Sequence, residues 1–226
     1  MNKKWLVVIF IILVLDVTVG FLVKRTFFYV NSQTISEKIK DKCLFLCGGS
    51  FKDCDIRKIS LEEIIKDSDV IVSGRALSDR IYVKGAVLTA FNVVKAYKGK
   101  ITNSKIYIFE PSYFNLGRYN NYFAYCGYNL MKPGHQYVLF LKKWKYTNFV
   151  RYNPYYRGKE IYTFAHNSAI EKFEINKLNI TKVINFEDDI IRYGQVKDYE
   201  VFVYNKNELA EYYQLKEKVL NWISQN

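Results

Sequence analysis

The stretch KGAVLTAFNVVKAYKGK, residues 84–100, decides the fold because its side chains alternate between two faces. One face carries Val87, Thr89, Phe91 and Val93, and the other carries Leu88, Ala90, Asn92 and Val94. A period of two in a segment rich in β-branched and aromatic residues predicts a strand. The Lys98-Gly99 pair predicts the turn that closes it.

Similar signals on both sides of this stretch predict further strands over 69–77, 104–111, 135–142, 160–165 and 169–175. The aromatic, Asn-rich segment 112–125 is interpreted as a loop. Ser60 with Glu63 forms a capping box that predicts a short helix over Leu61–Lys66. Asn205 with Glu208 predicts a helix to about Ser224, with one apolar face that packs against the domain.

These elements predict a mainly β fold, a small antiparallel OB-like Greek-key barrel with a helix before it and a helix after it. The expected organisation is an anchor or signal over 1–25, a stalk over 26–42, the barrel over 43–180 and a C-terminal extension over 181–226. The anchor is inferred from Trp5–Val23, 19 residues interrupted by one charge, Asp16. That length suffices to cross a bilayer as a helix. We expect a single-pass cell-membrane protein with its domain outside, or a secreted protein if the segment is cleaved.

The four cysteines, Cys43, Cys47, Cys54 and Cys126, all follow the expected anchor. An even number in an exported chain predicts two disulfides, with three pairings open. The spacing Cys-x3-Cys-x6-Cys with a distant fourth cysteine is not that of a zinc ribbon, so no metal is expected.

Enzymatic motifs are not evident in the sequence. It contains no Gly-x-Gly-x-x-Gly, Walker loop, His-Glu-x-x-His or Gly-x-Ser-x-Gly. The two histidines, His135 and His166, lie at expected turns and are interpreted as structural. We therefore expect a protein that is not an enzyme and has no cofactor.

Aromatic and basic residues interleave in two segments that we consider as a binding surface. The candidates are Tyr113, Phe114, Arg118, Tyr122, Tyr152, Tyr155 and Tyr156. Tyr-rich surfaces favour protein partners, whereas the formal charge of +12 also suits polyanions, including nucleic acid. Aromatic side chains that simply cover the barrel ends are a third interpretation. A protein partner is expected, and a small-molecule ligand is not.

Three stretches in order, DSDVIVSGRAL, VLTAFNVVKAYKGKITNSKIYIFEP and CGYNLMKPGHQYVLFLKK, resemble the netrin-like module. This is the OB fold of tissue inhibitors of metalloproteinases (TIMPs) and of bacterial relatives of unassigned function. The resemblance covers roughly Cys43 to Lys143. It implies that Cys126 pairs with Cys43 or Cys47, with Cys43–Cys126 and Cys47–Cys54 preferred.

One departure from the inhibitors bears on function. They begin with a cysteine, in a Cys-x-Cys arrangement, whose free amine and carbonyl chelate the protease zinc. Here the spacing is Cys-x3-Cys and Cys43 lies in mid-chain. Metalloprotease inhibition is therefore expected only if the chain is processed to Cys43.

Overall fold

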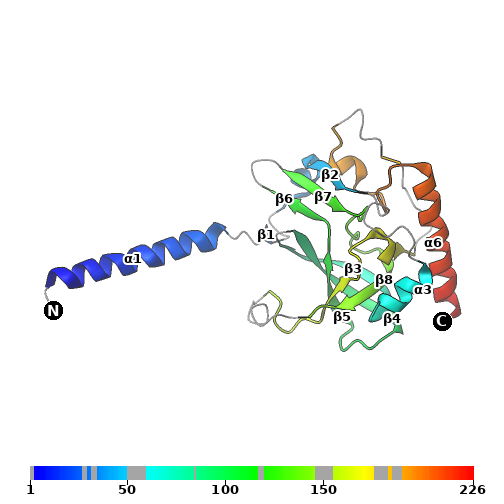
Figure 1. Ribbon diagram of the computed structural model, residues 1–226, viewed down its shortest axis with the longest axis horizontal. Helices are drawn as coiled ribbons and strands as arrows, with labels where there is room; N and C mark the ends of the chain where they lie inside the picture. Colours follow the sequence, from blue (N-terminus) through cyan, green and yellow to red (C-terminus); the bar gives the residue numbers. More distant parts are fainter. Residues whose placement is uncertain are drawn as a thin grey trace.

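The structure is a computed structural model. It describes residues 3–26, 30–31, 35–49, 60–83, 85–116, 120–145, 155–175, 183–184 and 190–226. A β barrel forms its centre, with the N-terminal helix α1 (Lys3–Thr26) projecting to one side and the C-terminal helix α6 (Lys206–Gln225) along the other (Figure 1).

Five strands close the barrel in the order β3-β4-β5-β9-β8, with β8 paired back to β3. They are β3 (Val70–Val83), β4 (Ala86–Lys98), β5 (Lys105–Glu110), β8 (Gln136–Lys143) and β9 (Ile161–Phe164). Four of the pairings are antiparallel and one, between β5 and β9, is parallel. The expectation of a wholly antiparallel barrel is therefore wrong for this pair. An odd number of strands cannot close into a ring in which every neighbour runs antiparallel.

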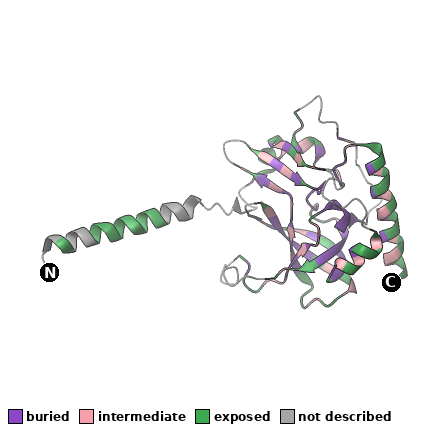
Figure 2. Cartoon of the chain, in the orientation of Figure 1, coloured by how far each residue is buried: buried purple, intermediate pink, exposed green. Residues whose placement is uncertain are grey.

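The alternating stretch that predicted the central strand forms β4, and it is buried on both faces from Val87 to Phe91. Phe91 joins Val72 and Leu139 in the barrel interior. On the outer face of β3 and β8, Ile71 and Phe140 lie under other elements. Figure 2 shows the buried residues concentrated in the barrel strands.

A smaller sheet lies beside the barrel in the order β2-β7-β6. Its strands are β2 (Leu44–Gly48), β6 (Tyr113–Asn115) and β7 (Asn121–Tyr125). The interpretation of 112–125 as a loop is therefore wrong, since two short strands lie within it. They pair with each other and, through β7, with β2 in parallel.

The segment expected to be a stalk, 26–42, contains ordered elements that contact the domain. β1 (Val30–Asn31) pairs with β3, and the helix α2 (Glu37–Lys42) follows. Ile35, between them, is buried in a core cluster with Phe45 and Tyr82. The described part of this segment thus belongs to the folded domain, because its apolar residue completes the core.

The predicted helices are confirmed. Helix α3 (Leu61–Asp67) begins at Ser60 with the expected capping box, and α6 is capped by the Asn205 side chain. Helix α6 packs Tyr212 and Val219 against the outer face of the barrel. The strand predicted over 169–175 begins instead as a 3-10 turn, η2 (Ala169–Glu171), followed by β10 (Lys172–Glu174). A further short helix, α5 (Tyr193–Val196), precedes the last segment.

Helix α1 includes the run expected to cross a membrane. The side chains described along it, from Phe10 to Val19, are exposed, as is Trp5. Over the side chains that the structure describes, no helix reaches the length and hydropathy of a membrane span. The side chains of residues 6–9 and 21–23, which belong to the expected span, lie outside this description.

Candidate functional site

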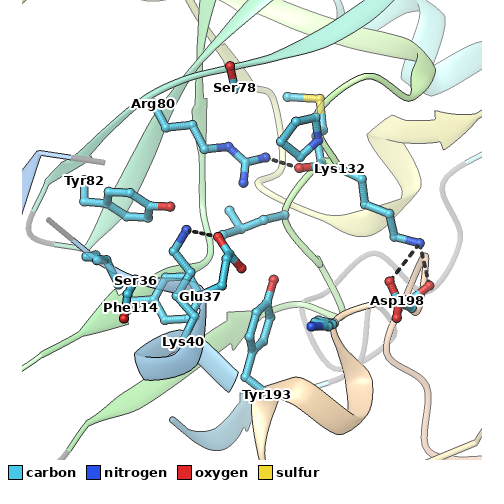
Figure 3. Close-up of a pocket in the computed structure, with 15 residues that line it drawn as sticks. Ser36, Glu37, Lys40, Ser78, Arg80, Tyr82, Phe114, Lys132, Tyr193 and Asp198 are labelled. Atoms are coloured by element: carbon cyan, nitrogen blue, oxygen red, sulfur yellow. Dashed lines mark hydrogen bonds and ion pairs between the residues drawn. The ribbon is translucent and has the colours of Figure 1, made fainter. Parts of the chain in front are cut away.

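A pocket of about 490 Å³ lies where the barrel meets the smaller sheet, α2 and α5. Its lining residues come from segments far apart in the sequence (Figure 3). They are Ile35, Ser36, Glu37, Lys40, Ser78, Arg80, Tyr82, Phe114, Leu130, Met131, Lys132, Pro133, Tyr193, Lys197 and Asp198. Ligand pockets commonly have such volumes and combine apolar walls with a few convergent polar groups.

The far half of β3 places two of the polar groups in the pocket. The pairing of β3 with β4 is irregular between Ala76 and Arg80 and then resumes with Arg80 opposite Thr89. Because side chains alternate along a strand, Arg80 and Tyr82 lie on the same face. Figure 3 shows both side chains directed into the same space as that of Tyr193.

Arg80 is the most unusual residue of the pocket because its cationic side chain is about nine-tenths buried. Its Nη2 donates a hydrogen bond to the backbone oxygen of Met131 and lies 3.6 Å from Glu110 Oε1. Its Nε is buried and has no hydrogen-bond partner among the described residues. An unsatisfied buried donor costs about 1–3 kcal/mol, so the protein bears a cost in stability to hold this guanidinium at the wall of the pocket.

Glu110 lies next to the guanidinium of Arg80 and helps to hold it in place. Its carboxylate, which is completely buried, accepts hydrogen bonds from Tyr128 Oη (2.9 Å), the Met131 N–H (2.7 Å) and the Thr89 hydroxyl. These donors compensate the carboxylate for the loss of water. Arg80 is therefore held in place by a carboxylate whose other partners all belong to the protein core.

Two tyrosines complete the polar part of the pocket. Tyr193 contacts Phe114 and Tyr122 through its ring, at centroid distances of 5.0 and 4.3 Å. Burial raises the pKa of Tyr193, and the nearby Arg80 charge opposes that rise, so the hydroxyl is neutral at physiological pH. Tyr82 packs on Phe114 and lies under the Lys40 ammonium, 5.4 Å from the ring centre.

The lysines of the pocket are each paired with an acidic residue. Lys40 Nζ lies 2.8 Å from Glu37 Oε1, and Lys197 Nζ lies 3.0 Å from Asp41 Oδ1. Lys132 Nζ donates to the backbone oxygen of Asp198 (2.7 Å) and lies 4.0 Å from its carboxylate. The charges around the pocket are thus close to balanced.

The chain matches no family model, no curated protein and no solved structure. The resemblance to the netrin-like module therefore remains a prediction.

The structure does not bring the predicted surface residues together as an exposed patch. Tyr122 and Tyr156 are buried, so their assignment to an exposed binding surface is wrong. Phe114 is also buried, but it lines the pocket. Tyr113 is half-buried and Tyr155 is exposed. Arg118 and Tyr152 lie outside the described residues. The rings of Phe114 and Tyr122 fill the space between the barrel and the smaller sheet, whereas Tyr156 packs against Leu88 and Phe109 of the barrel strands.

The preferred cysteine pairing is also wrong. Cys43 has a free, buried thiol that donates to Ile39 O (3.3 Å), and the Cys47 thiol donates to Gly49 O (3.4 Å). Cys126 is disulfide-bonded, and Cys54 lies outside the described residues.

The pairing of β2 with β7 explains why Cys43 and Cys126 are not bonded. The two strands run parallel, with Leu44 opposite Asn121 and Gly48 opposite Tyr125. Cys43 and Cys126 therefore lie at opposite ends of the ladder, separated by roughly 15–20 Å at about 3.3 Å per residue. A disulfide requires Cα atoms within about 7 Å.

The backbone of Cys43 also bears on the inhibitor hypothesis. Its N–H donates to Lys40 O (3.0 Å), and its carbonyl accepts from the Tyr193 N–H (2.9 Å). These are the two groups that a TIMP-like inhibitor is expected to present to a metal. In this fold both are engaged by the protein itself.

Sequence reasoning missed Arg80, Tyr82 and Tyr193. The predicted strand ended at residue 77, whereas β3 continues to Val83. A usable signal was the sequence RIYV, in which Arg80 and Tyr82 alternate with Ile81 and Val83. Nothing local to Tyr193 indicates the pocket, because α5 reaches it only through the tertiary fold.

Proposed function

We propose that this protein is a membrane-tethered binding module that holds a protein partner in the pocket around Arg80. The pocket combines a nearly buried arginine with apolar walls, and this combination carries the proposal. A partner group bound there would face the Arg80 guanidinium and cover apolar surface in one step.

The raised pKa values of two lysines in the pocket favour binding over catalysis. Burial lowers the pKa of Lys40, but hydrogen bonds with Glu37 and Tyr82 outweigh this and raise it. The hydrogen bond to Asp41 raises the pKa of Lys197. A lysine that acts as a general base needs a lowered pKa, so these side chains suit a charged binding surface better.

We further propose that the barrel is OB-like and related to the netrin-like module. Numbered along the chain, the barrel strands follow the circular order 1-2-3-5-4. This order suits a five-stranded Greek-key barrel. The three resembling stretches supply β3, β4, β5 and β8, so four of the five barrel strands fall within the resemblance.

The membrane tether is proposed from the apolar run Trp5–Val23 and its exposed side chains in α1. A disulfide at Cys126 is consistent with an oxidising compartment outside the cell. Alkaline carbonate extraction of native membranes tests the tether. The chain should stay in the membrane pellet, and its release into the supernatant would contradict the tether.

The partner site can be tested with a photo-crosslinking amino acid in the full chain, expressed in its host membrane. Position Ser36 lines the pocket and is exposed, whereas Val94 is exposed but does not line it. We expect a discrete protein adduct from position 36 and not from position 94. That adduct should be lost on Arg80→Met and kept on Arg75→Met, an exposed arginine of the same strand. An adduct that ignores Arg80, or the lack of any adduct at position 36, would refute the pocket as partner site.

A further inference from the structure

We propose that the pocket recognises a carboxylate carried on an apolar group, such as the last residue of a partner chain. This inference rests on the proposed function and names the chemistry of the group that the pocket takes. Three features of the pocket support it in turn: the arginine with its two neighbouring tyrosines, the charge balance and the walls.

The cation at the pocket wall is Arg80, and arginine presents N–H groups in a planar fork that matches a carboxylate. Arg80 is held by Glu110 and by the Met131 carbonyl, both through Nη2. The same side chain lines the pocket. The side chain is therefore pre-organised for an incoming oxygen, since no rotamer freedom is lost when the ligand binds.

Two hydroxyl groups extend the same recognition. Tyr82 and Tyr193 direct their hydroxyls toward the space that Arg80 faces (Figure 3). A neutral hydroxyl donates one hydrogen bond, and burial keeps Tyr193 neutral by raising its pKa. A carboxylate has two oxygens and about four acceptor positions, so Arg80 and the tyrosines can share it.

The charge balance favours a single negative charge over two. Lys40, Lys132 and Lys197 are offset by Glu37, Asp198 and Asp41, and Arg80 is offset by Glu110. A phosphate monoester, which carries nearly two charges, would meet the carboxylates of Glu37 and Asp198 in the pocket lining. A carboxylate with one charge meets less repulsion.

The walls favour an apolar group next to the carboxylate. Ile35, Phe114, Leu130, Met131 and Pro133 line the pocket together with the polar groups. Their apolar surface is the natural contact for the side chain of a hydrophobic terminal residue. A free acidic metabolite without an apolar part would leave these walls uncovered.

Three small probes test the inference with the full chain in detergent micelles, with binding measured by ligand-observed NMR. N-acetylphenylalanine carries the carboxylate, its amide is neutral, and phenyl phosphate carries nearly two charges. We expect the acid to bind at least tenfold more tightly than either of the others. Arg80→Met should weaken the acid at least tenfold and leave the amide unchanged, and the Arg75→Met control should match the wild type.

Near-ultraviolet circular dichroism checks whether Arg80→Met keeps the native fold. A second variant keeps the inference testable if Arg80→Met does not fold. Tyr193→Phe keeps the ring contacts and removes one hydroxyl, and it should weaken the acid several-fold without changing the amide. Equal binding of acid and amide, or tighter binding of phenyl phosphate, overturns the carboxylate inference. If the crosslink at position 36 still depends on Arg80, the partner site stands even then. Failure of all three probes together with loss of that crosslink refutes both.

Discussion

Lys216 Nζ lies 2.7 Å from Glu200 Oε2, and both side chains are almost completely buried. The pair joins α6 to the segment that precedes it. Glu200 Oε1 also accepts from Tyr212 Oη at 3.0 Å and from the Glu174 N–H at 2.8 Å. One carboxylate therefore connects α6 with β10 and fixes how the helix lies on the barrel.

Removal of the ammonium alone should destabilise the protein strongly. Lys216→Met leaves Glu200 buried without its cation, and we expect a loss of about 3–5 kcal/mol in the free energy of unfolding. Urea unfolding of the full chain, followed by tryptophan fluorescence, measures it. Lys218→Met, an exposed change on the same helix, should stay within about 0.5 kcal/mol of the wild type. Adding Glu200→Gln to Lys216→Met should recover part of the loss. A single Lys216→Met variant as stable as the control would contradict this role.

Lys172 should make stability rise with pH. Its ammonium donates to Asn129 O and lies 4.3 Å from the centre of the Tyr128 ring. Burial lowers its pKa to about 8, although Glu110 opposes the shift. The unfolded chain, with the ordinary pKa of about 10.4, binds more protons between these values, so stability is lost as pH falls through 8. Relative to Lys172→Met, the wild type should gain about 1.5 kcal/mol between pH 8 and 9.5.

The control for that titration is Lys143→Met, an exposed lysine on the neighbouring strand β8. It should keep the wild-type slope because the change leaves Lys172 and its buried partners in place. Parallel slopes for wild type and Lys172→Met would show that this lysine is not the source of the pH dependence.

The thiols should separate into two classes under alkylation. Cys43 is fully buried but not disulfide-bonded, so iodoacetamide should reach it once the chain is unfolded, without any reductant. Burial also raises the pKa of the Cys43 thiol, which lowers its reactivity in the native state. Cys126 should react only after reduction. Peptide mapping by mass spectrometry reads both sites. Labelling of Cys126 without reductant, or protection of Cys43 in denaturant, would contradict the assignment.

The sequence predicted the elements whose signals are local. The strand over 84–100 and the helix after Asn205 were found because alternation and capping repeat within a few residues. β6 and β7 were missed because strands of three and five residues depend on their partners. The cysteine pairing failed because the parallel register of β2 and β7 joins segments about 77 positions apart. Arg80 was missed for a similar reason, since only the tertiary fold shows that its Nε lacks an acceptor.

The last prediction concerns a close backbone approach in the barrel, at Gly74. A Cβ at this position would lie 2.1 Å from the backbone oxygen of Asn92 on β4. Backbone cannot yield as a flexible side chain does, so Gly74→Ala must push β3 away from β4 where their register shifts. We expect a loss of about 3 kcal/mol. Gly85→Ala is the control, because its Cβ meets nothing within 4 Å and only the positive φ of +81° opposes the change, at about 1 kcal/mol. Urea unfolding measures the loss in the free energy of unfolding for both variants. Equal losses would mean that β3 and β4 can separate at Gly74 without cost, and the tight pairing described there would be wrong.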